Sequence, residues 1–159
     1  MKHNIIFLDI DGVLNNHRFL SHNQNLKPEL QRNIDGKKVV LLKEIIAQTG
    51  AKIVLSSSWR KMYNDLLEPL SPEAAEIRSA LEDKEIEIWD KTDNCRDKAD
   101  AIINWLNRNR DVTNQYIVID DDPVLLSRFA ESDIVRTSYY IGLSSREVSQ
   151  AIDKLNHHR

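Results

Sequence analysis

Two carboxylates follow the first apolar segment of the chain. Asp9 and Asp11 lie two positions apart in "FLDIDGVLN" (7–15). In an extended strand, residues i and i+2 point to the same face, and Gly12 allows the chain to turn sharply after them. Two carboxylates held this close repel each other unless a cation neutralises them. Taken alone, the pair also fits a solvated acidic turn, because Asp-Gly is common in turns.

Two further polar clusters end apolar segments later in the sequence. They are Ser56, Ser57 and Ser58 after 53–55, and Asp120, Asp121 and Asp122 after 116–119. In an open α/β sheet the carboxyl ends of parallel strands meet at one edge, where ligands bind. Clustered oxygen ligands favour Mg²⁺, which also bridges readily to phosphate. The pattern therefore predicts a magnesium and phosphate site at this edge.

Short apolar segments alternate with amphipathic segments along the chain, which predicts the elements that would position these clusters. The expected strands are 4–8, 53–55, 85–89, 116–119 and one within 134–143. The expected helices are 35–49 with Gly50 beyond its end, one from Ser71 and Pro72, 97–109, one from Pro123, and 144–155 with Ser144 and Glu147 as a capping box. Residues 16–34 are polar and irregular, which indicates a long loop or flap.

This alternation predicts an α/β fold: a doubly wound, Rossmann-like parallel sheet of about five strands with helices on both faces. A length of 159 residues suits a single domain over 1–159. No apolar stretch is long enough to cross a membrane, and a lone cysteine, Cys95, fits a reducing cytoplasm and an incidental thiol. Nothing indicates an obligate protein partner. The final "NHHR" (156–159) is too short to indicate a metal site.

The ordered motifs resemble those of the haloacid dehalogenase-like (HAD) phosphohydrolase superfamily. "DIDGVLN" looks like its first motif, "IVLSSSWR" like its second, "DKADAIINWL" like its third and "YIVIDDDP" like its fourth. The combination of "FLDIDGVLN", "SSSWR" and "IDDD" more narrowly resembles the compact HAD domains associated with RNA-repair proteins. The fourth motif lacks the glycine that is common elsewhere in the superfamily.

The resemblance implies a Mg²⁺-dependent phosphomonoesterase that works through an aspartyl-phosphate. Asp9 would be the nucleophile, and Asp11 the general acid and then the general base. Mg²⁺ would be held by Asp9, by the backbone carbonyl of Asp11 and by Asp121, with Asp120 behind them or as a further ligand. These roles would explain why two acids share one face: they act on opposite bonds of one phosphorus atom.

The resemblance also implies partners for the phosphate. Ser56 would donate a hydrogen bond to a phosphoryl oxygen, and Lys98, in preference to Arg96, would stabilise the charge on Asp9 and the phosphate. Asp122 precedes Pro123 and fits a helix N-cap better than a metal ligand. Further substrate-binding candidates are Gly12, Ser57 and Arg60, the last of which could instead bind a helix-end acid.

The short segments between the motifs and the distribution of charge bear on the substrate class. Residues 16–50 and 61–97, where HAD enzymes carry cap insertions, are too short for a large independent cap, and an open site favours a bulky substrate such as a nucleic-acid end or a phosphoprotein. Such a site would also admit small phosphoesters, poorly and without selectivity. Residues 1–61 hold 10 Lys and Arg against 5 acids, although the net charge of the chain is −3, and scattered solvated lysines explain this excess as well as a path for a phosphate does. The cations expected to contact a phosphorylated nucleic-acid end or nucleotide are Arg18, Lys27, Arg60 and Lys61.

Two other classes of protein remain alternatives. A receiver-like phosphoacceptor domain is also doubly wound, but it needs an adjacent acid pair after its first strand and a lone acceptor after its third. A catalytically silent HAD-fold binding module needs none of the catalytic residues, so the presence of all of them argues against it.

Overall fold

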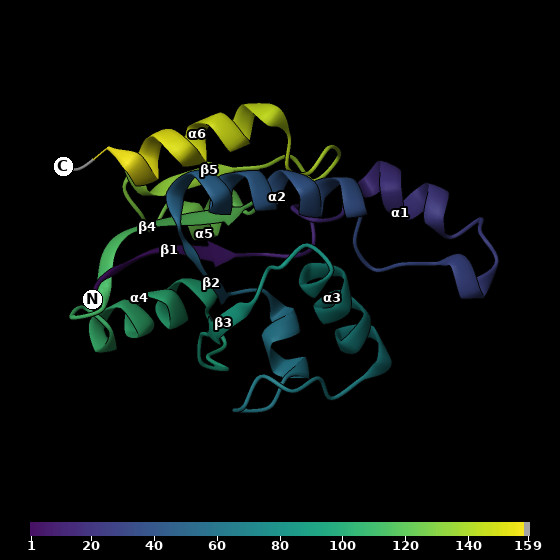
Figure 1. Ribbon diagram of the computed structural model, residues 1–159, viewed down its shortest axis with the longest axis horizontal. Coiled ribbons are helices and arrows are strands. Elements are labelled where there is room, and N and C mark those ends of the chain that lie inside the picture. Colours follow the sequence, from purple (N-terminus) through teal and green to yellow (C-terminus); the bar gives the residue numbers. More distant parts are fainter. Residues whose placement is uncertain (158–159) are drawn as a thin grey trace.

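A five-stranded parallel sheet lies at the centre of the computed structural model, which describes residues 1–157 (Figure 1). Its order is β3-β2-β1-β4-β5, which is the doubly wound arrangement predicted from the sequence. The strands are β1 (His3–Leu8), β2 (Lys52–Leu55), β3 (Ile88–Lys91), β4 (Thr113–Asp120) and β5 (Ile134–Arg136).

The register of the central strands sets the position of the acids. Leu8 of β1 pairs with Leu55 of β2 on one side and with Ile119 of β4 on the other. The next residue in each chain segment therefore emerges at the same edge of the sheet. These three residues are Asp9, Ser56 and Asp120.

Helices cover both faces of the sheet, as predicted. Ile6 and Leu8 of β1 face the core that α2 (Gly36–Thr49), α3 (Pro72–Glu82) and α6 (Ser145–Asn156) complete. Ile5 and Phe7 face the opposite core, which includes α4 (Lys98–Arg108) and α5 (Pro123–Leu126). Because residues 5–8 of β1 are fully buried on both faces, they form a continuous apolar run rather than an alternation of apolar and polar residues.

Most predicted helix ends are confirmed by their caps. The N-cap Asp35 accepts the Lys37 N–H at the start of α2, and Gly50 ends that helix in the left-handed conformation at φ +66°. Ser71 accepts the Ala74 N–H at the start of α3. The expected capping box of α6 is only half formed. Ser144 Oγ lies 2.9 Å from Glu147 Oε2 and makes no hydrogen bond to the helix backbone.

The structure corrects the prediction of a loop over 16–34. This segment contains a helix, α1 (His17–Asn23), and a 3-10 turn, η1 (Pro28–Leu30), which project from the sheet (Figure 1). Neither element has a buried residue, so the sequence shows no apolar period there. Asn16 caps α1 by accepting the Phe19 N–H.

One strand boundary also differs from the prediction. β3 begins at Ile88 rather than at Glu85, because Glu85 has φ +58° in the turn that follows α3. β5 (Ile134–Arg136) lies within the predicted segment 134–143, and the rest of that segment folds back as a turn over Ser138–Gly142. Two further 3-10 elements are η2 (Ser58–Met62) and η3 (Glu131–Asp133).

No separate cap layer forms over 61–97. Three α3 side chains, Ala74, Ile77 and Leu81, are buried in the main core, and Tyr63 donates a hydrogen bond to the Ala74 carbonyl. Within residues 1–157 no helix combines the length and apolar character needed to cross a membrane. The last two residues of the "NHHR" segment lie outside the described part of the chain.

Candidate active site

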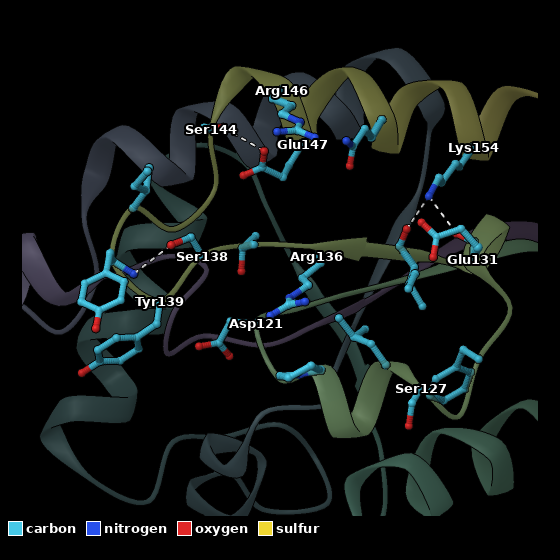
Figure 2. A pocket seen from close by; sticks show the side chains of 18 residues that line it. Asp121, Ser127, Glu131, Arg136, Ser138, Tyr139, Ser144, Arg146, Glu147 and Lys154 are labelled. Atoms are coloured by element: carbon cyan, nitrogen blue, oxygen red, sulfur yellow. Dashed lines mark hydrogen bonds between the residues drawn. The ribbon is translucent and has the colours of Figure 1, made fainter.

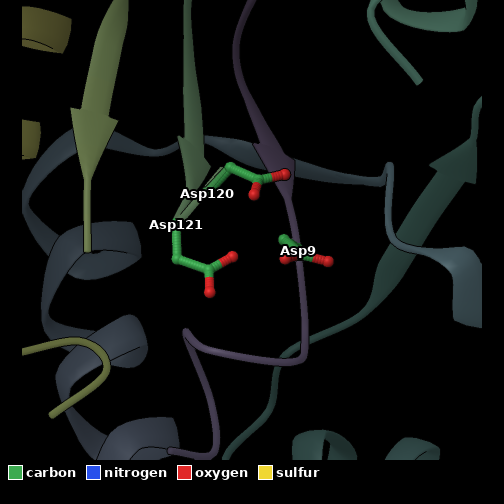
Figure 3. Close-up of side chains that lie close together, drawn as sticks. All are labelled: Asp9, Asp120 and Asp121. Atoms are coloured by element: carbon green, nitrogen blue, oxygen red, sulfur yellow. The ribbon is translucent and has the colours of Figure 1, made fainter. Parts of the chain in front are cut away.

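Three carboxylates converge at the carboxyl edge of the sheet, between the ends of β1 and β4 (Figure 3). Asp9, Asp120 and Asp121 each offer one oxygen, and these oxygens lie within 4.8 Å of one another. Asp9 is 5% exposed and Asp120 is fully buried. Buried like charges at this separation are unstable unless cations compensate them, so the cluster needs a positive partner.

Lys98 supplies one positive charge to the cluster. Its Nζ lies 3.5 Å from Asp9 Oδ1 and 3.2 Å from Asp120 Oδ2. Lys98 is the first residue of α4, directly after the N-cap Asp97, so the helix start aims its side chain at the sheet edge. Arg96, the alternative in the sequence, forms no ion pair with a described residue.

One ammonium does not balance the three acids. Burial, and then the neighbouring Asp120, raise the pKa of Asp9 to about 8, although Lys98 pulls it down. Burial and Asp120 likewise raise the pKa of Asp121 to about 6. Burial alone would lower the pKa of Lys98, but Asp9 and Asp120 outweigh it and raise that pKa. This excess of carboxylate oxygen fits a hard divalent cation such as Mg²⁺.

Asp11 occupies a different environment from Asp9. Its side chain is exposed, and its Oδ1 accepts a hydrogen bond of 2.9 Å from Asn15 Nδ2. Asn15 is 2% exposed, donates to the Asn33 carbonyl as well, and accepts the Gly12 N–H at 3.0 Å. A fixed, buried amide thus orients an exposed carboxylate. The sequence reasoning missed Asn15, whose signal was an asparagine four residues after Asp11 in the same tight turn.

Gly12 allows the loop after β1 to pass beside Asp121. Its φ is +81°, and a Cβ placed on it would overlap the Asp121 carboxylate. Its carbonyl accepts a 2.7 Å hydrogen bond from Thr137 Oγ1, and its N–H is taken by Asn15. These contacts give Gly12 a role in space and backbone conformation, and its expected contact with substrate stays a prediction. Thr137, buried after β5, is a second residue that the sequence did not single out.

Ser56 carries a polar group without a partner. Its hydroxyl oxygen is buried at the end of β2, next to Asp9 in the register, and bonds to no group in residues 1–157. Buried hydroxyls are normally hydrogen-bonded, so an unsatisfied one at a site edge points to a ligand. A phosphoryl oxygen could accept a hydrogen bond from this hydroxyl.

A comparison with protein families identifies the family of this chain. The family model described as "HAD domain in Swiss Army Knife RNA repair proteins" matches residues 5–148. The chain belongs to this HAD family. The match covers all four motif segments, and membership supports a phosphohydrolase-type function. The comparisons with curated proteins and with solved structures gave no match.

Two residues of this HAD domain that were expected to contact substrate have structural contacts instead. Ser57 is buried and caps η2 by accepting the Trp59 N–H at 3.2 Å. Arg60 is 1% exposed, and its guanidinium donates to the carbonyls of Ser57, Asp93 and Cys95 at 3.0, 2.8 and 2.7 Å. Burial also lowers the pKa of Arg60. Its role is therefore corrected: it holds the loop after β3 against the end of β2.

Asp122 of the HAD domain caps α5, as predicted. Its Oδ1 accepts the N–H groups of Val124 and Leu125 at 2.9 and 3.4 Å. Asp120 Oδ1 in turn accepts the Asp122 N–H at 2.9 Å. Asp120 is bound to this N–H and to Lys98, and Asp122 is bound to the start of α5. Asp121 therefore has the carboxylate that is most available to a cation.

Replacing Gly12 with alanine tests the packing at Asp121. Adopting positive φ costs a side chain about 1–2 kcal/mol, and the overlap with the carboxylate adds to this, so we expect Gly12→Ala to be less stable and to bind Mg²⁺ more weakly. Gly36→Ala is the matched control, since Gly36 opens α2 with no atom within 4 Å of the added Cβ. Equal thermal stability and Mg²⁺ affinity in the two variants would show that Gly12 is not needed.

The raised pKa of Asp9 predicts how the metal-free HAD domain responds to pH. An unfolded Asp titrates near pH 4, whereas Asp9 in the folded state holds its proton up to about pH 8. Between these values the folded state binds more protons, so the free energy of unfolding should fall as pH rises from about 4 to about 8. Denaturant titrations in EDTA measure this slope, which should be shallower in Asp9→Asn. An identical slope in that variant would contradict the assignment.

Proposed function

We propose that this single HAD domain is a Mg²⁺-dependent phosphomonoester hydrolase that forms an aspartyl-phosphate on Asp9. The observation that carries the proposal is the contrast between two acids two residues apart. Asp9 is buried among Lys98, Asp120 and Asp121, whereas Asp11 is exposed and held by Asn15. A nucleophile needs a fixed carboxylate that a cation can keep ionised, and a group that acts first as acid and then as base needs to exchange protons with solvent.

The cluster supports a bound cation. Asp9, Asp121 and the backbone carbonyl of Asp11 would hold Mg²⁺, with Asp120 kept behind them by Lys98 and by the Asp122 N–H. The bound ion would neutralise the carboxylates and the charge of the substrate phosphate. Lys98 lies beside Asp9 and would help keep it ionised during attack.

The first chemical step would use Asp9 and Asp11 on opposite sides of phosphorus. A carboxylate oxygen of Asp9 attacks the phosphorus atom and forms an acyl phosphate while the bond to the leaving oxygen breaks. Asp11 gives its proton to that leaving oxygen. Ser56, whose hydroxyl has no partner among residues 1–157, would donate a hydrogen bond to a phosphoryl oxygen.

The second step would reverse the role of Asp11. Its carboxylate, now deprotonated, takes a proton from a water molecule, which attacks the same phosphorus atom. The bond between phosphorus and the Asp9 oxygen breaks, and inorganic phosphate leaves. Both carboxylates return to their starting states, so the cycle balances.

We propose phosphorylated nucleic-acid ends as the substrate class. The matching family occurs in RNA repair proteins, and no separate cap layer forms over residues 61–97. Three of the expected basic residues, Arg18, Lys27 and Lys61, are exposed and stay candidates for phosphate contacts, whereas the buried Arg60 does not.

The test of this substrate class is a comparison of kcat/KM at low and moderate salt. The substrates are oligonucleotides phosphorylated at the 3′ or 5′ end, the matching mononucleotides, a sugar phosphate and an aryl phosphate. Each phosphate contact to a single strand contributes a log–log salt slope of about −0.7, so the oligonucleotide should lose activity with salt more steeply than the mononucleotide. A mononucleotide or sugar phosphate that is better at every salt concentration would exclude nucleic-acid ends and leave the phosphatase proposal in place.

A further inference from the structure

A hollow of about 1060 Å³ begins at Asp121 and extends along β5 to α6 (Figure 2). Asp121 connects it to the candidate active site. Arg136 and Tyr139 line it close to that end, and Arg146 of α6 lines it farther along. Beyond its connection to Asp121, none of the roles proposed above uses this hollow.

Three aromatic rings form an exposed cluster at the hollow. Tyr139 and Tyr140 are 47% and 68% exposed, and their ring centroids lie 5.9 Å apart. The ring of His17, at the start of α1, lies 6.0 Å from Tyr139 and 5.6 Å from Tyr140. We call these three residues the aromatic cluster. Tyr140 leaves most of its surface exposed and Tyr139 about half, so both rings present faces or edges that a ligand can contact.

The aromatic cluster is held firmly beside the catalytic loop. The turn Ser138–Gly142 carries both tyrosines, and the His17 N–H donates to the Tyr139 carbonyl at 2.9 Å. Asn16 Nδ2 donates to the Ile141 carbonyl at 2.8 Å. Because these bonds join the turn to the segment that follows Asp9 and Asp11, the rings have a fixed position relative to the acids. Binding to a fixed surface costs less ordering entropy than binding to a mobile loop.

Two guanidinium groups at the hollow are unpaired within the part of the chain that the structure describes. Arg136 and Arg146 form no hydrogen bond or ion pair through their side chains with any residue of 1–157. The other cation at the hollow, Lys154, donates to the carbonyls of Glu131 and Ile134. Arg136 pairs in register with Asp120, so it lies one strand away from the acids. Free guanidinium groups at this place complement phosphate.

We propose that this surface binds the unpaired nucleotides next to the phosphorylated end of a single-stranded nucleic acid. The terminal phosphate would lie at Asp9 and Asp121, the adjacent bases would stack on Tyr139 and Tyr140, and the following phosphates would contact the two arginines. Every base has a flat face, so stacking on aromatic rings with cations along the backbone binds single strands without a required sequence. The placement of the terminal phosphate rests on the proposed function.

The charges favour a polynucleotide over a phosphopeptide. A singly phosphorylated peptide brings one phosphate, which the active site would take, and it would pair the two arginines only where its sequence places acidic residues at the right spacing. A polynucleotide brings one phosphate for each nucleotide, so it supplies partners for the active site, Arg136 and Arg146 together. A duplex end exposes only the outer face of its terminal base pair, whereas successive unpaired bases can each present a face to the aromatic cluster.

Direct binding tests the aromatic cluster. Fluorescence anisotropy would measure the Kd of a short, end-phosphorylated single strand for Asp9→Asn protein, which leaves the strand intact. Adding Tyr140→Ala should weaken binding about tenfold, and Tyr140→Trp should restore it with indole fluorescence quenched by the stacked base. Val40→Ala, an exposed apolar truncation on α2, is the matched control and should not weaken it. Binding that is equal in Tyr140→Ala and Val40→Ala would overturn the proposal.

Three further measurements separate this proposal from its alternatives. For strands that lack the bases next to the end, the tenfold difference in Kd between the parent and Tyr140→Ala should disappear. Arg136→Gln should reduce the slope of log affinity against log salt concentration by about 0.7. Weakened binding of a phosphopeptide, but not of the strand, in Tyr140→Ala would overturn it. If the protein hydrolyses an aryl phosphate but Tyr140→Ala binds the single strand as tightly as the parent does, the proposed binding surface is rejected and the proposed function stands. If Tyr140→Ala weakens binding but the protein hydrolyses no aryl phosphate, the binding surface stands and the phosphatase function is rejected.

Discussion

Asp9→Asn is expected to lower kcat/KM for any phosphomonoester by about 10⁴-fold or more, with no phosphoenzyme formed. The amide cannot attack phosphorus, and the surrounding groups cannot replace it: Lys98 is cationic, and Asp120 is bound to Lys98 and to the Asp122 N–H. Steady-state kinetics with an aryl phosphate measures the loss. Asp83→Asn, an exposed acid at the end of α3, is the matched control and should retain activity.

Asp11→Asn should fail in a different way. Its nucleophile is intact, so attack can still occur with a good leaving group, but departure of a poor one and hydrolysis of the intermediate should both be slow. The two acids act as a unit, and the double variant should therefore be little worse than Asp9→Asn alone. Losses that multiply in the double variant would contradict the assigned roles.

Removing divalent metal is expected to abolish turnover, and Mg²⁺ should restore it. Without a cation, burial and Asp120 raise the pKa of Asp9 to about 8, so near neutral pH most of the protein would carry a protonated, non-nucleophilic Asp9. Lys98 lies near Asp9 and Asp120, but one ammonium does not offset three clustered carboxylates.

The measurement is turnover of an aryl phosphate after EDTA treatment, then after titration with Mg²⁺ and with Ca²⁺. Ca²⁺ takes more ligands at longer distances than Mg²⁺ does, so it should restore activity poorly. Turnover that persists unchanged after chelation would show that Lys98 alone keeps Asp9 ionised and that the cation is not required.

The sheet and the convergence of its acids could be predicted because they depend on local patterns. Continuous apolar runs predicted buried parallel strands, and the residue after each run had to emerge at the same edge. Asp9, Ser56 and Asp120 meet there because Leu8 pairs with both Leu55 and Ile119. The cap role of Asp122 was predictable too, since Pro123 follows it.

What could not be predicted depends on contacts between distant segments. Arg60 reads as a cation beside a serine cluster, and only the fold shows that three backbone carbonyls enclose it. Asn15 reads as a turn residue, and its second partner is the carbonyl of Asn33, 18 residues away. Nothing in the sequence singles out Tyr139 and Tyr140, because the turn that carries them is held by hydrogen bonds to the distant segment after β1.

A phosphoenzyme measurement tests the central claim most directly. Protein mixed with an aryl phosphate and Mg²⁺ is quenched in acid, digested and examined by mass spectrometry. The account predicts one phosphoryl group on the peptide containing Asp9, removable by hydroxylamine, accumulating in Asp11→Asn and absent from Asp9→Asn. A phosphoryl group on another residue, or turnover without any phosphoenzyme in Asp11→Asn, would contradict the account. A phosphoryl group on Asp9 that persists without turnover would indicate a receiver-like domain. The absence of both phosphorylation and turnover would indicate a silent binding module.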